Sequence, residues 1–376
     1  MADISTCLPL SRPSVVAAHE LIASHIHLTP VLTNTTLSDL ASTPRTADEL
    51  KGTRWEGRTP AKPKVRLWFK CENLQRVGAF KPRGAFHAVE RLKLEEGWKE
   101  GGGMQKGVVT HSSGNFAQAL ALAAKESGIP AHIVMPEISN PLKIAGTRAY
   151  GANVIFSGST ALERDAVAKK VMEETGARFI PSYDHPDIIL GQGTMGLEMQ
   201  AQVQELIGKG GKGLNGIIAP CGGGGMLSGI ALSAEDTGIK VFGAEPIHEG
   251  ADDAKRGYYS GTRVPAVSSL SIADGLRTPL GAHTWSIIRR DRGLVHGMYS
   301  VTEEEIVKTM RLVMERMKVV VEPSACVALA AVLFDEDLRE RLEREGGEEA
   351  WELGVVFSGG NAGVEKIAEL FGKAYS

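Results

Sequence analysis

Cysteine is scarce in this sequence, which has four cysteines among 376 residues, at the widely spaced positions Cys7, Cys71, Cys221 and Cys326. No CxxC pair occurs, so the sequence predicts neither a disulfide framework nor a cysteine-based metal cluster. No run approaches the roughly 18 apolar residues of a membrane helix, and the N-terminus lacks the basic and apolar regions of a signal peptide. We therefore expect a cytoplasmic protein with reduced thiols and no membrane partner.

An excess of one charge is also missing, because 42 Lys and Arg residues face 45 Asp and Glu residues, for a net charge of -3. The basic residues are scattered along the chain, so no electrostatic footprint for nucleic acid is present. With 43% hydrophobic residues, a chain of this length can bury a sizeable core in one or two lobes. The expected partners are small molecules.

Short apolar runs alternate with amphipathic stretches, which is typical of parallel βαβ units and predicts an α/β fold. The runs cover 65–70, 107–110, 131–134, 153–156, 216–219, 240–244 and 354–357. Many of them end in Gly, Ser, Asn or Pro just before a helical stretch, where ligands bind in open α/β sheets. Residues 41–63 and 335–350 are rich in charge and break this pattern, so we expect both to be solvated surface.

A run of four glycines follows one of these apolar runs, in CGGGG at 221–225, and precedes a helical stretch. Consecutive glycines let backbone N–H groups converge on an anion, and a helix N-terminus adds its dipole. Neither GxGxxG nor GxxxxGK[ST] is present, so a monophosphate fits better than a dinucleotide. The alternative is a tight turn that needs glycine only for its backbone conformation.

Lys81 follows an aromatic residue, Phe80, and precedes Pro82, which favours the first position of a helix. A lysine considered alone is most often a solvated side chain. It becomes a candidate Schiff-base lysine only beside a phosphate site and a site for a cofactor ring.

Two further turns carry polar groups. The segment THSSGN places Ser112, Ser113 and Asn115 at the start of a helical stretch, where hydroxyls, an amide and free N–H groups suit a carboxylate or simply cap the helix. Near the C-terminus, Ser358 follows an apolar run in VVFSGG. It can reach a ring nitrogen or cap a turn.

Taken together, these segments resemble the fold-type II enzymes that use pyridoxal phosphate (PLP), and within them the serine racemase and serine/threonine dehydratase branch. The resemblance runs from about residue 14 to residue 361. It rests on motifs that occur in the family's order with similar spacing: KCENLQ, GAFKPRGA, THSSGN, GQGT, GGGGMLSGIA, AEP, ADG, ERMK, EPSA and SGGN.

The resemblance implies a tryptophan synthase β-like α/β fold of two lobes, each with a mostly parallel twisted sheet flanked by helices. A large PLP-binding domain would comprise 1–106 and 185–376, and a small domain would comprise 107–184. The cofactor would lie between them. The family is usually dimeric, so we expect a homodimer. ATP stimulates some relatives, and no motif here decides whether it is an effector.

The resemblance also implies roles for single residues around the cofactor. Lys81 would bind it covalently, Phe80 would lie against its ring, Asn115 would meet the ring hydroxyl, and Ser358 would face the ring nitrogen. The phosphate would be bound by backbone donors of Gly222, Gly223, Gly224, Gly225 and Met226. A hydroxyl at the ring nitrogen cannot protonate it as a carboxylic acid can, so β-elimination competes well with other outcomes.

For the substrate, the resemblance implies that the carboxylate of a small amino acid is held by Ser112 and Asn115, with Arg164 and Thr278 as further candidates. Ser113 matches the second acid/base of the racemases, on the ring face opposite Lys81. These matches predict a serine racemase with accompanying dehydratase activity. A dedicated dehydratase for serine, threonine or 3-hydroxyaspartate and a catalytically silent PLP-binding protein are the alternatives.

A site for a divalent cation (Mg²⁺, Ca²⁺ or Mn²⁺) follows from the same resemblance, with Glu245, Ala251 and Asp253 as ligands. The loop between Pro246 and ADD is longer than in vertebrate serine racemases, so two solvated acids are the alternative. A second departure is Phe116, where most relatives have histidine. His25 and His27 resemble a metal pair, but we interpret them as packing or capping residues at the end of a helix.

Overall fold

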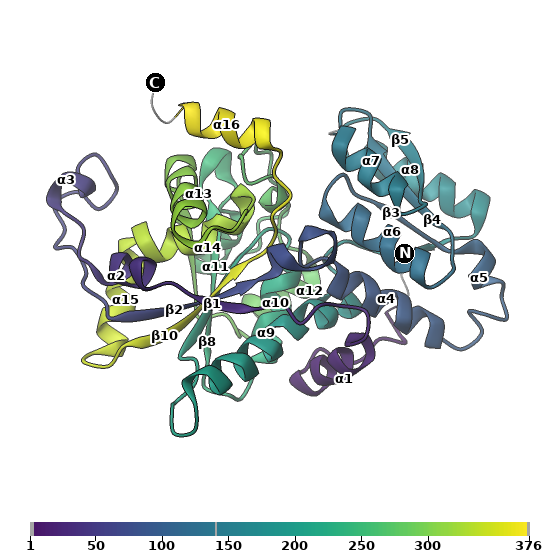
Figure 1. Cartoon of the computed structure of the whole chain (residues 1–376). Helices are drawn as coiled ribbons and strands as arrows, with labels where there is room; N and C mark the ends of the chain where they lie inside the picture. Colours follow the sequence, from purple (N-terminus) through teal and green to yellow (C-terminus); the bar gives the residue numbers. More distant parts are fainter. Residues whose placement is uncertain (1–3, 140, 374–376) are drawn as a thin grey trace.

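The structure is a computed structural model that describes residues 4–139 and 141–373. It is an α/β protein with a six-stranded sheet and a four-stranded sheet, which lies at one end of the molecule (Figure 1). Within the described residues, no helix is long and apolar enough to span a membrane. The predicted fold class is therefore confirmed, including the mostly parallel strands.

The six-stranded sheet has the order β1-β2-β10-β7-β8-β9, and only β1 runs antiparallel to its neighbour. Its strands are β1 (Val31–Thr33), β2 (Val65–Cys71), β10 (Trp351–Phe357), β7 (Gly216–Pro220), β8 (Lys240–Pro246) and β9 (Gly297–Val301). Because successive side chains of a strand point to opposite faces, Leu67 and Phe69 join one hydrophobic cluster while Trp68 joins another. Both faces of this sheet are consequently buried.

Each face of the large sheet has its own layer of helices. One layer contains α1 (Arg12–Ile22), α9 (Pro186–Ile207) and α10 (Gly225–Ser233). The other contains α2 (Thr35–Ser42), α13 (Glu303–Met317), α14 (Pro323–Phe334), α15 (Glu336–Gly346) and α16 (Val364–Lys373). Helix α14 is apolar on all sides because it lies between the sheet and the outer helices.

The four-stranded sheet is entirely parallel and has the order β5-β4-β3-β6. Its strands are β5 (Asn153–Ser157), β4 (Ala131–Pro136), β3 (Val108–His111) and β6 (Arg178–Phe179), all within the range predicted for the small domain. Helices α6 (Asn115–Glu126) and α7 (Pro141–Ala149) cover one face, and α8 (Ala161–Thr175) covers the other. Helix α4 (Pro82–Leu94) packs against α6 and shares its hydrophobic cluster, so it joins the two sheets.

Short helices complete the chain: α3 (Ala47–Leu50), α5 (Gly103–Lys106), α11 (Asp253–Ser260) and α12 (Ala282–Trp285). Single turns of tighter or wider helix occur at Glu72–Leu74, Arg76–Gly78, His248–Gly250, Asp274–Leu276 and Ser286–Arg290. All seven apolar runs identified in the sequence are strands, whereas β1, β6 and β9 were not predicted.

Helices α4, α9 and α10 approach one another through glycines. A Cβ atom added at Gly191 of α9 would lie 2.6 Å from the carbonyl oxygen of Arg83 in α4. One added at Gly229 of α10 would lie 2.3 Å from the carbonyl oxygen of Ile189 in α9. These contacts leave no space for any side chain, so glycine is required for the close backbone approach.

The two charged stretches that we expected to be solvated are mostly exposed, as expected, but they also pack against each other and bury some of their residues. Leu50, Trp55 and Ala61 are buried in the first stretch. In the second, Asp335 at the N-cap of α15 is buried, as are Glu336, Leu338, Arg339 and Leu342 within the helix. The charges are used for pairing, since Arg54 donates to the buried Asp335 carboxylate at 2.6 Å.

Replacing Arg54 by Gln should lower the free energy of unfolding by about 2 kcal/mol, because it leaves the buried Asp335 carboxylate without its ion-pair partner. Arg58→Gln is the matched control, because Arg58 pairs with the exposed Asp337 and Glu340 carboxylates and should contribute less than about 1 kcal/mol. Urea unfolding of the variants measures both values. Equal decreases in the free energy of unfolding would show that the buried ion pair stabilises the fold no more than the exposed pairs do.

Candidate active site

Lys81 lies immediately before α4, with Pro82 at the first helical position as the sequence predicts. Its Nζ donates a hydrogen bond to the carbonyl oxygen of Ser182 at 3.0 Å. The same atom lies 5.0 Å from the centre of the Phe80 ring and 5.7 Å from that of Phe116. The amine is therefore held between two aromatic rings and one backbone carbonyl, at the junction of the two sheets.

This environment changes the proton affinity of Lys81. Burial of the ammonium group lowers the pKa of Lys81 to about 8, and the negative charge of Glu322 opposes that decrease. A lysine with such a pKa has a large neutral fraction at neutral to mildly alkaline pH. It can act as a nucleophile or as a base.

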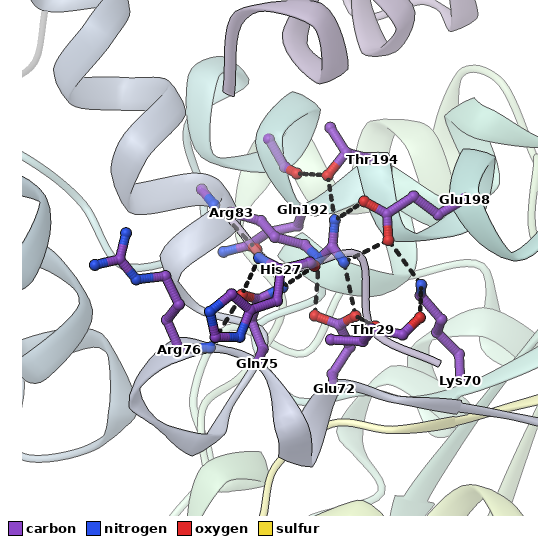
Figure 2. Close-up of polar contacts among 12 residues, drawn as sticks. His27, Thr29, Lys70, Glu72, Gln75, Arg76, Arg83, Gln192, Thr194 and Glu198 are labelled. Atoms are coloured by element: carbon purple, nitrogen blue, oxygen red, sulfur yellow. Dashed lines mark hydrogen bonds and ion pairs between the residues drawn. The ribbon is translucent and has the colours of Figure 1, made fainter. Parts of the chain in front are cut away.

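A buried ionic network fixes the start of α4 (Figure 2). Arg83, two residues after Lys81, donates through its Nε and both terminal nitrogens to Glu72 and Glu198 at 2.7 to 2.8 Å, and to Thr194 at 3.0 Å. Lys70 donates to the same Glu198 carboxylate at 2.7 Å. The two cations and two carboxylates are all buried, so each charge has a partner.

The glycine loop follows β7 and leads into α10, as predicted. Gly224 has φ of 84°, which favours glycine. A Cβ atom at Gly223 would lie 2.4 Å from the Tyr183 ring, and one at Gly222 would lie 2.8 Å from the Cα atom of Leu276. Because Tyr183 follows Ser182, the segment that accepts the Lys81 hydrogen bond also packs on the loop.

Asn115 is the first residue of α6, which begins at the predicted turn after β3. Its Nδ2 donates to Glu322 at 3.1 Å, and its Oδ1 accepts a hydrogen bond from Asn361 at 3.0 Å. In the same turn, Ser112 Oγ accepts a hydrogen bond from the Gly114 N–H at 3.4 Å. Ser113 is exposed.

Ser358 directly follows β10 and is buried. Its carbonyl oxygen accepts a hydrogen bond from the Phe80 N–H at 3.0 Å. The next residue, Gly359, forms a β-bridge with Ala79. The Ser358 segment and the Lys81 segment, which are far apart in the sequence, therefore lie side by side.

Within the part of the chain that the structure describes, two predicted substrate residues form no hydrogen bond with this group. Arg164 lies on α8 and donates to the carbonyl oxygen of Ser159 at 3.0 Å. Thr278 is exposed and lies two residues beyond Leu276, which contacts the glycine loop. Their roles as substrate ligands stay predictions.

Sequence reasoning gave no role to Glu322, which the structure places at the centre of the site. Burial raises the pKa of Glu322 to about 7, and the charge of Asp274 adds to the increase. Glu322 belongs to the EPSA motif and Asn361 to the SGGN motif, so both lie in segments that were noticed. The signal for Glu322 was a carboxylate directly before α14, which is apolar except for Ser324.

The acidic residues of the predicted cation site also meet in the structure. Glu245, at the end of β8, accepts hydrogen bonds from the N–H groups of Ala254 and Lys255 at 3.2 and 2.7 Å. Burial raises the pKa of both Glu245 and Asp253, and the Asp253 charge raises that of Glu245 further. Within the described chain, Asp253 Oδ1 is buried without a hydrogen-bond partner. Ala251, two residues before Asp253 in the sequence, is also buried.

Comparison with known proteins identifies the cofactor class. Residues 53–350 match the model of the family described as pyridoxal-phosphate dependent enzyme. The chain belongs to this family. It is 39% identical to a serine racemase of Arabidopsis thaliana over 95% of each chain, and 38% identical to the L-threo-3-hydroxyaspartate ammonia-lyase of Saccharomyces cerevisiae over 95% of this chain and 94% of the other.

A solved structure supports the fold-type II assignment. The structure of maize serine racemase aligns with a TM-score of 0.80 and 35% identity, and covers 97% of this chain and 98% of that chain. The resemblance inferred from the motifs is confirmed, and the chain is a PLP-dependent enzyme of the racemase and ammonia-lyase group.

The residues of this site fit PLP. Lys81 supplies an amine whose pKa is lowered to about 8, which suits a lysine that forms a Schiff base with a carbonyl. The glycine loop has no side chains at the N-terminus of α10, where N–H groups and the helix dipole favour a phosphate. Side chains at Gly222 and Gly223 would collide with Leu276 and Tyr183.

The pKa of Lys81 can be tested directly. In the cofactor-free chain, competitive labelling with acetic anhydride should give a titration midpoint near pH 8 for this amine, since burial disfavours the ammonium form. Glu322→Gln should move the midpoint to lower pH, because the Glu322 charge stabilises that ammonium. A midpoint near 10.5, the ordinary value for lysine, would show that the site is solvated.

Proposed function

We propose that this PLP enzyme interconverts L- and D-serine and also eliminates water from serine to give an enamine, which water then hydrolyses to pyruvate and ammonia. The proposal is supported by serine racemases at 37 to 39% identity from a plant and Dictyostelium discoideum. The ammonia-lyase of Saccharomyces cerevisiae is equally similar, so identity alone does not select the reaction. The observation that carries the proposal is a hydroxyl, Ser113, in the same turn as Asn115, beside the Lys81 site.

When bound, PLP supplies an electron sink that stabilises negative charge at the α-carbon. Lys81 Nζ, with its lowered pKa, removes the α-proton of the L-substrate on one face. Ser113 Oγ gives a proton to the opposite face, which produces the D-amino acid. The loss of the β-hydroxyl after the same proton removal by Lys81 needs no donor on the Ser113 face.

The other site residues bind and orient. We assign phosphate binding to the N–H groups of Gly222–Gly225 and Met226, contact with the ring to Phe80, the ring hydroxyl to Asn115, and the ring nitrogen to Ser358. Ser112 and Asn115 would hold the substrate carboxylate, with Arg164 and Thr278 as further candidates that require movement or a bound substrate to reach it. Asn115 is oriented for this role by Glu322 and Asn361.

A dedicated ammonia-lyase is the second candidate. It is favoured by the 38% identity to the yeast hydroxyaspartate enzyme and by a hydroxyl rather than a carboxylic acid in the Ser358 segment. In that case Ser113 is a bystander. A cytoplasmic location, a homodimer and an effect of ATP stay predictions.

Ser113→Ala separates the two candidates. Formation of D-serine from L-serine should fall by roughly 10² to 10⁴, because a general acid is missing on the face away from Lys81. Elimination from L-serine should stay within about tenfold of the wild type, since Lys81 alone removes that α-proton. Chiral chromatography and pyruvate release measure the two rates.

Ser112→Ala is the matched control, because it removes a hydroxyl from the same turn. If Ser112 binds the carboxylate, its loss should raise KM for both reactions in parallel. Should Ser113→Ala also reduce both reactions of L-serine equally, Ser113 binds substrate or supports the turn. Should it keep racemising at the original rate, another group donates the second proton.

We also propose that a divalent cation binds Glu245 and Asp253, with the Ala251 carbonyl as a third ligand. Oxygen donors and two buried like charges suit a hard cation such as Mg²⁺, Ca²⁺ or Mn²⁺. Asp253 Oδ2 accepts a hydrogen bond from the Leu280 N–H at 3.4 Å, and the Leu280 side chain packs against Gly224. A cation would thereby support the phosphate loop.

Chelation with EDTA should lower the melting temperature and the activity together, because two buried carboxylates lose their counter-charge. In Asp253→Asn, which already lacks one ligand, EDTA should have little effect. Differential scanning calorimetry with elemental analysis measures this. An unchanged wild-type melting temperature with no metal found would refute the cation site.

A further inference from the structure

Cys7, His185 and Asp187 converge at a second polar cluster, which lies where the N-terminal segment meets the start of α9. Cys7 Sγ lies 3.9 Å from His185 Nε2 and 3.6 Å from Asp187 Oδ2. One ligand atom from each residue lies within 4.8 Å of the others. The three residues come from segments about 180 positions apart and contribute one sulfur, one nitrogen and one oxygen.

These separations are close to those of a tetrahedral zinc shell. With Zn–S near 2.3 Å and Zn–N or Zn–O near 2.0 Å, tetrahedral angles place sulfur about 3.5 Å from the nitrogen and oxygen ligands. The observed 3.6 and 3.9 Å differ from this by a few tenths of an ångström. The ligand atoms of His185 and Asp187 lie within 4.8 Å of each other, so these two side chains would approach each other when an ion binds.

Among the described residues, the local structure orients His185 and Asp187 toward Cys7. His185 precedes the first turn of α9, and its Nδ1 accepts a long hydrogen bond from the Asp187 N–H at 3.3 Å. Asp187 is 92% buried, and Arg91 Nε faces its Oδ1 at 3.8 Å. That contact leaves Oδ2 directed at Cys7, so Arg91 orients the carboxylate in the manner of an outer-shell partner.

The cluster opens on a cavity of about 180 Å³ that His185 and Asp187 line together with Arg91 and Thr6. This space can supply a water molecule as the fourth ligand of an ion. Arg91 also donates to the Thr6 carbonyl oxygen at 2.7 Å, which brings the residue before Cys7 to the same place. The N-terminal segment is thus held against α4 and α9.

We propose that Cys7, His185 and Asp187 form a binding site for Zn²⁺ or a similar borderline transition-metal ion, with water as the fourth ligand. Thiolate and imidazole ligands select such ions over Mg²⁺ and Ca²⁺, which prefer oxygen. Binding transfers the thiol proton of Cys7 to solvent and forms the S–Zn bond without any redox change. The ion would join the N-terminal segment to the segment that carries Ser182 and Tyr183.

The position of this site gives it a structural consequence. Ser182, whose carbonyl oxygen accepts the Lys81 hydrogen bond, lies three residues before His185. Asp184, between them, accepts hydrogen bonds from the first N–H groups of α12 at 2.8 to 3.1 Å. An ion at His185 would therefore restrain the segment on which Lys81 and the glycine loop both rest.

The test measures zinc in chelator-stripped holoenzyme that is dialysed against Zn²⁺ in the presence of excess Mg²⁺, which saturates the Glu245 and Asp253 pair. Wild type should retain one Zn²⁺ per chain. Cys7→Ser and Asp187→Asn should each weaken Zn²⁺ binding at least about tenfold, since loss of a direct ligand exceeds the usual outer-shell effect. Cys326→Ala, a buried thiol elsewhere, should leave it unchanged.

Cobalt gives an independent readout. Co²⁺ added to the stripped protein should produce a thiolate-to-cobalt charge-transfer band in the difference spectrum against Cys7→Ser. The same band should persist in Cys326→Ala and in Asp253→Asn. Circular dichroism checks that each variant is folded. If Cys7→Ser does not fold, Asp187→Asn is compared with wild type instead.

Two results would overturn the proposal. One is wild type that holds no Zn²⁺ beyond the Mg²⁺-protected background. The other is a Zn²⁺ content that is no lower in Cys7→Ser and Asp187→Asn than in wild type; if it falls only in Asp253→Asn, the ion is assigned to the carboxylate pair. Racemase and ammonia-lyase activity is not a readout, so either result leaves the proposed function untouched.

Discussion

Arg83 is the arginine on which the placement of the active-site lysine depends. All five of its N–H donors are used, in bonds to Glu72, Glu198 and Thr194. These partners come from the end of β2 and from α9, so one guanidinium fixes α4 against both. Removal of one member of such a buried pair typically costs about 3 to 5 kcal/mol, because the remaining charge stays buried without a partner. This arrangement also fixes the backbone position of Lys81, since only Pro82 separates it from Arg83.

Much of this architecture was readable from the sequence, for reasons that differ from element to element. The apolar runs predicted seven strands, because buried parallel strands are continuously apolar. Strand β6 has two residues and β1 has three, too few for any pattern. The stretches 41–63 and 335–350 are mostly exposed, as expected, but their pairing was not predicted, because charge patterns report polarity and not the partner. Arg54 and Asp335 are almost 300 positions apart.

The candidate site shows the same division. Lys81, the glycine loop and Asn115 could be identified from the sequence, because each lies in a turn whose residue types indicate what it can bind. Glu322 was missed because a carboxylate in sequence gives no sign of burial, and its importance comes from Asn115 and Lys81 in space. The raised pKa of about 7 for Glu322 and the lowered pKa of about 8 for Lys81 differ by one unit. Burial thus brings the proton affinities of the two groups much closer together than in water, so the site can hold a proton on either group near neutral pH.

The glycine contacts among α4, α9 and α10 also limit how this protein can be engineered. Replacing helical glycines by alanine is a common route to thermostability, because alanine lowers the entropy of the unfolded chain. At Gly191, Gly193 and Gly229 the new methyl group would lie within 2.6 Å of backbone atoms of a neighbouring helix. The helices would have to separate, and the lysine at the head of α4 would move with them. Gly372 in α16 has open space around an added Cβ atom. A stabilising glycine-to-alanine replacement is therefore better placed there than in the contact between α4, α9 and α10.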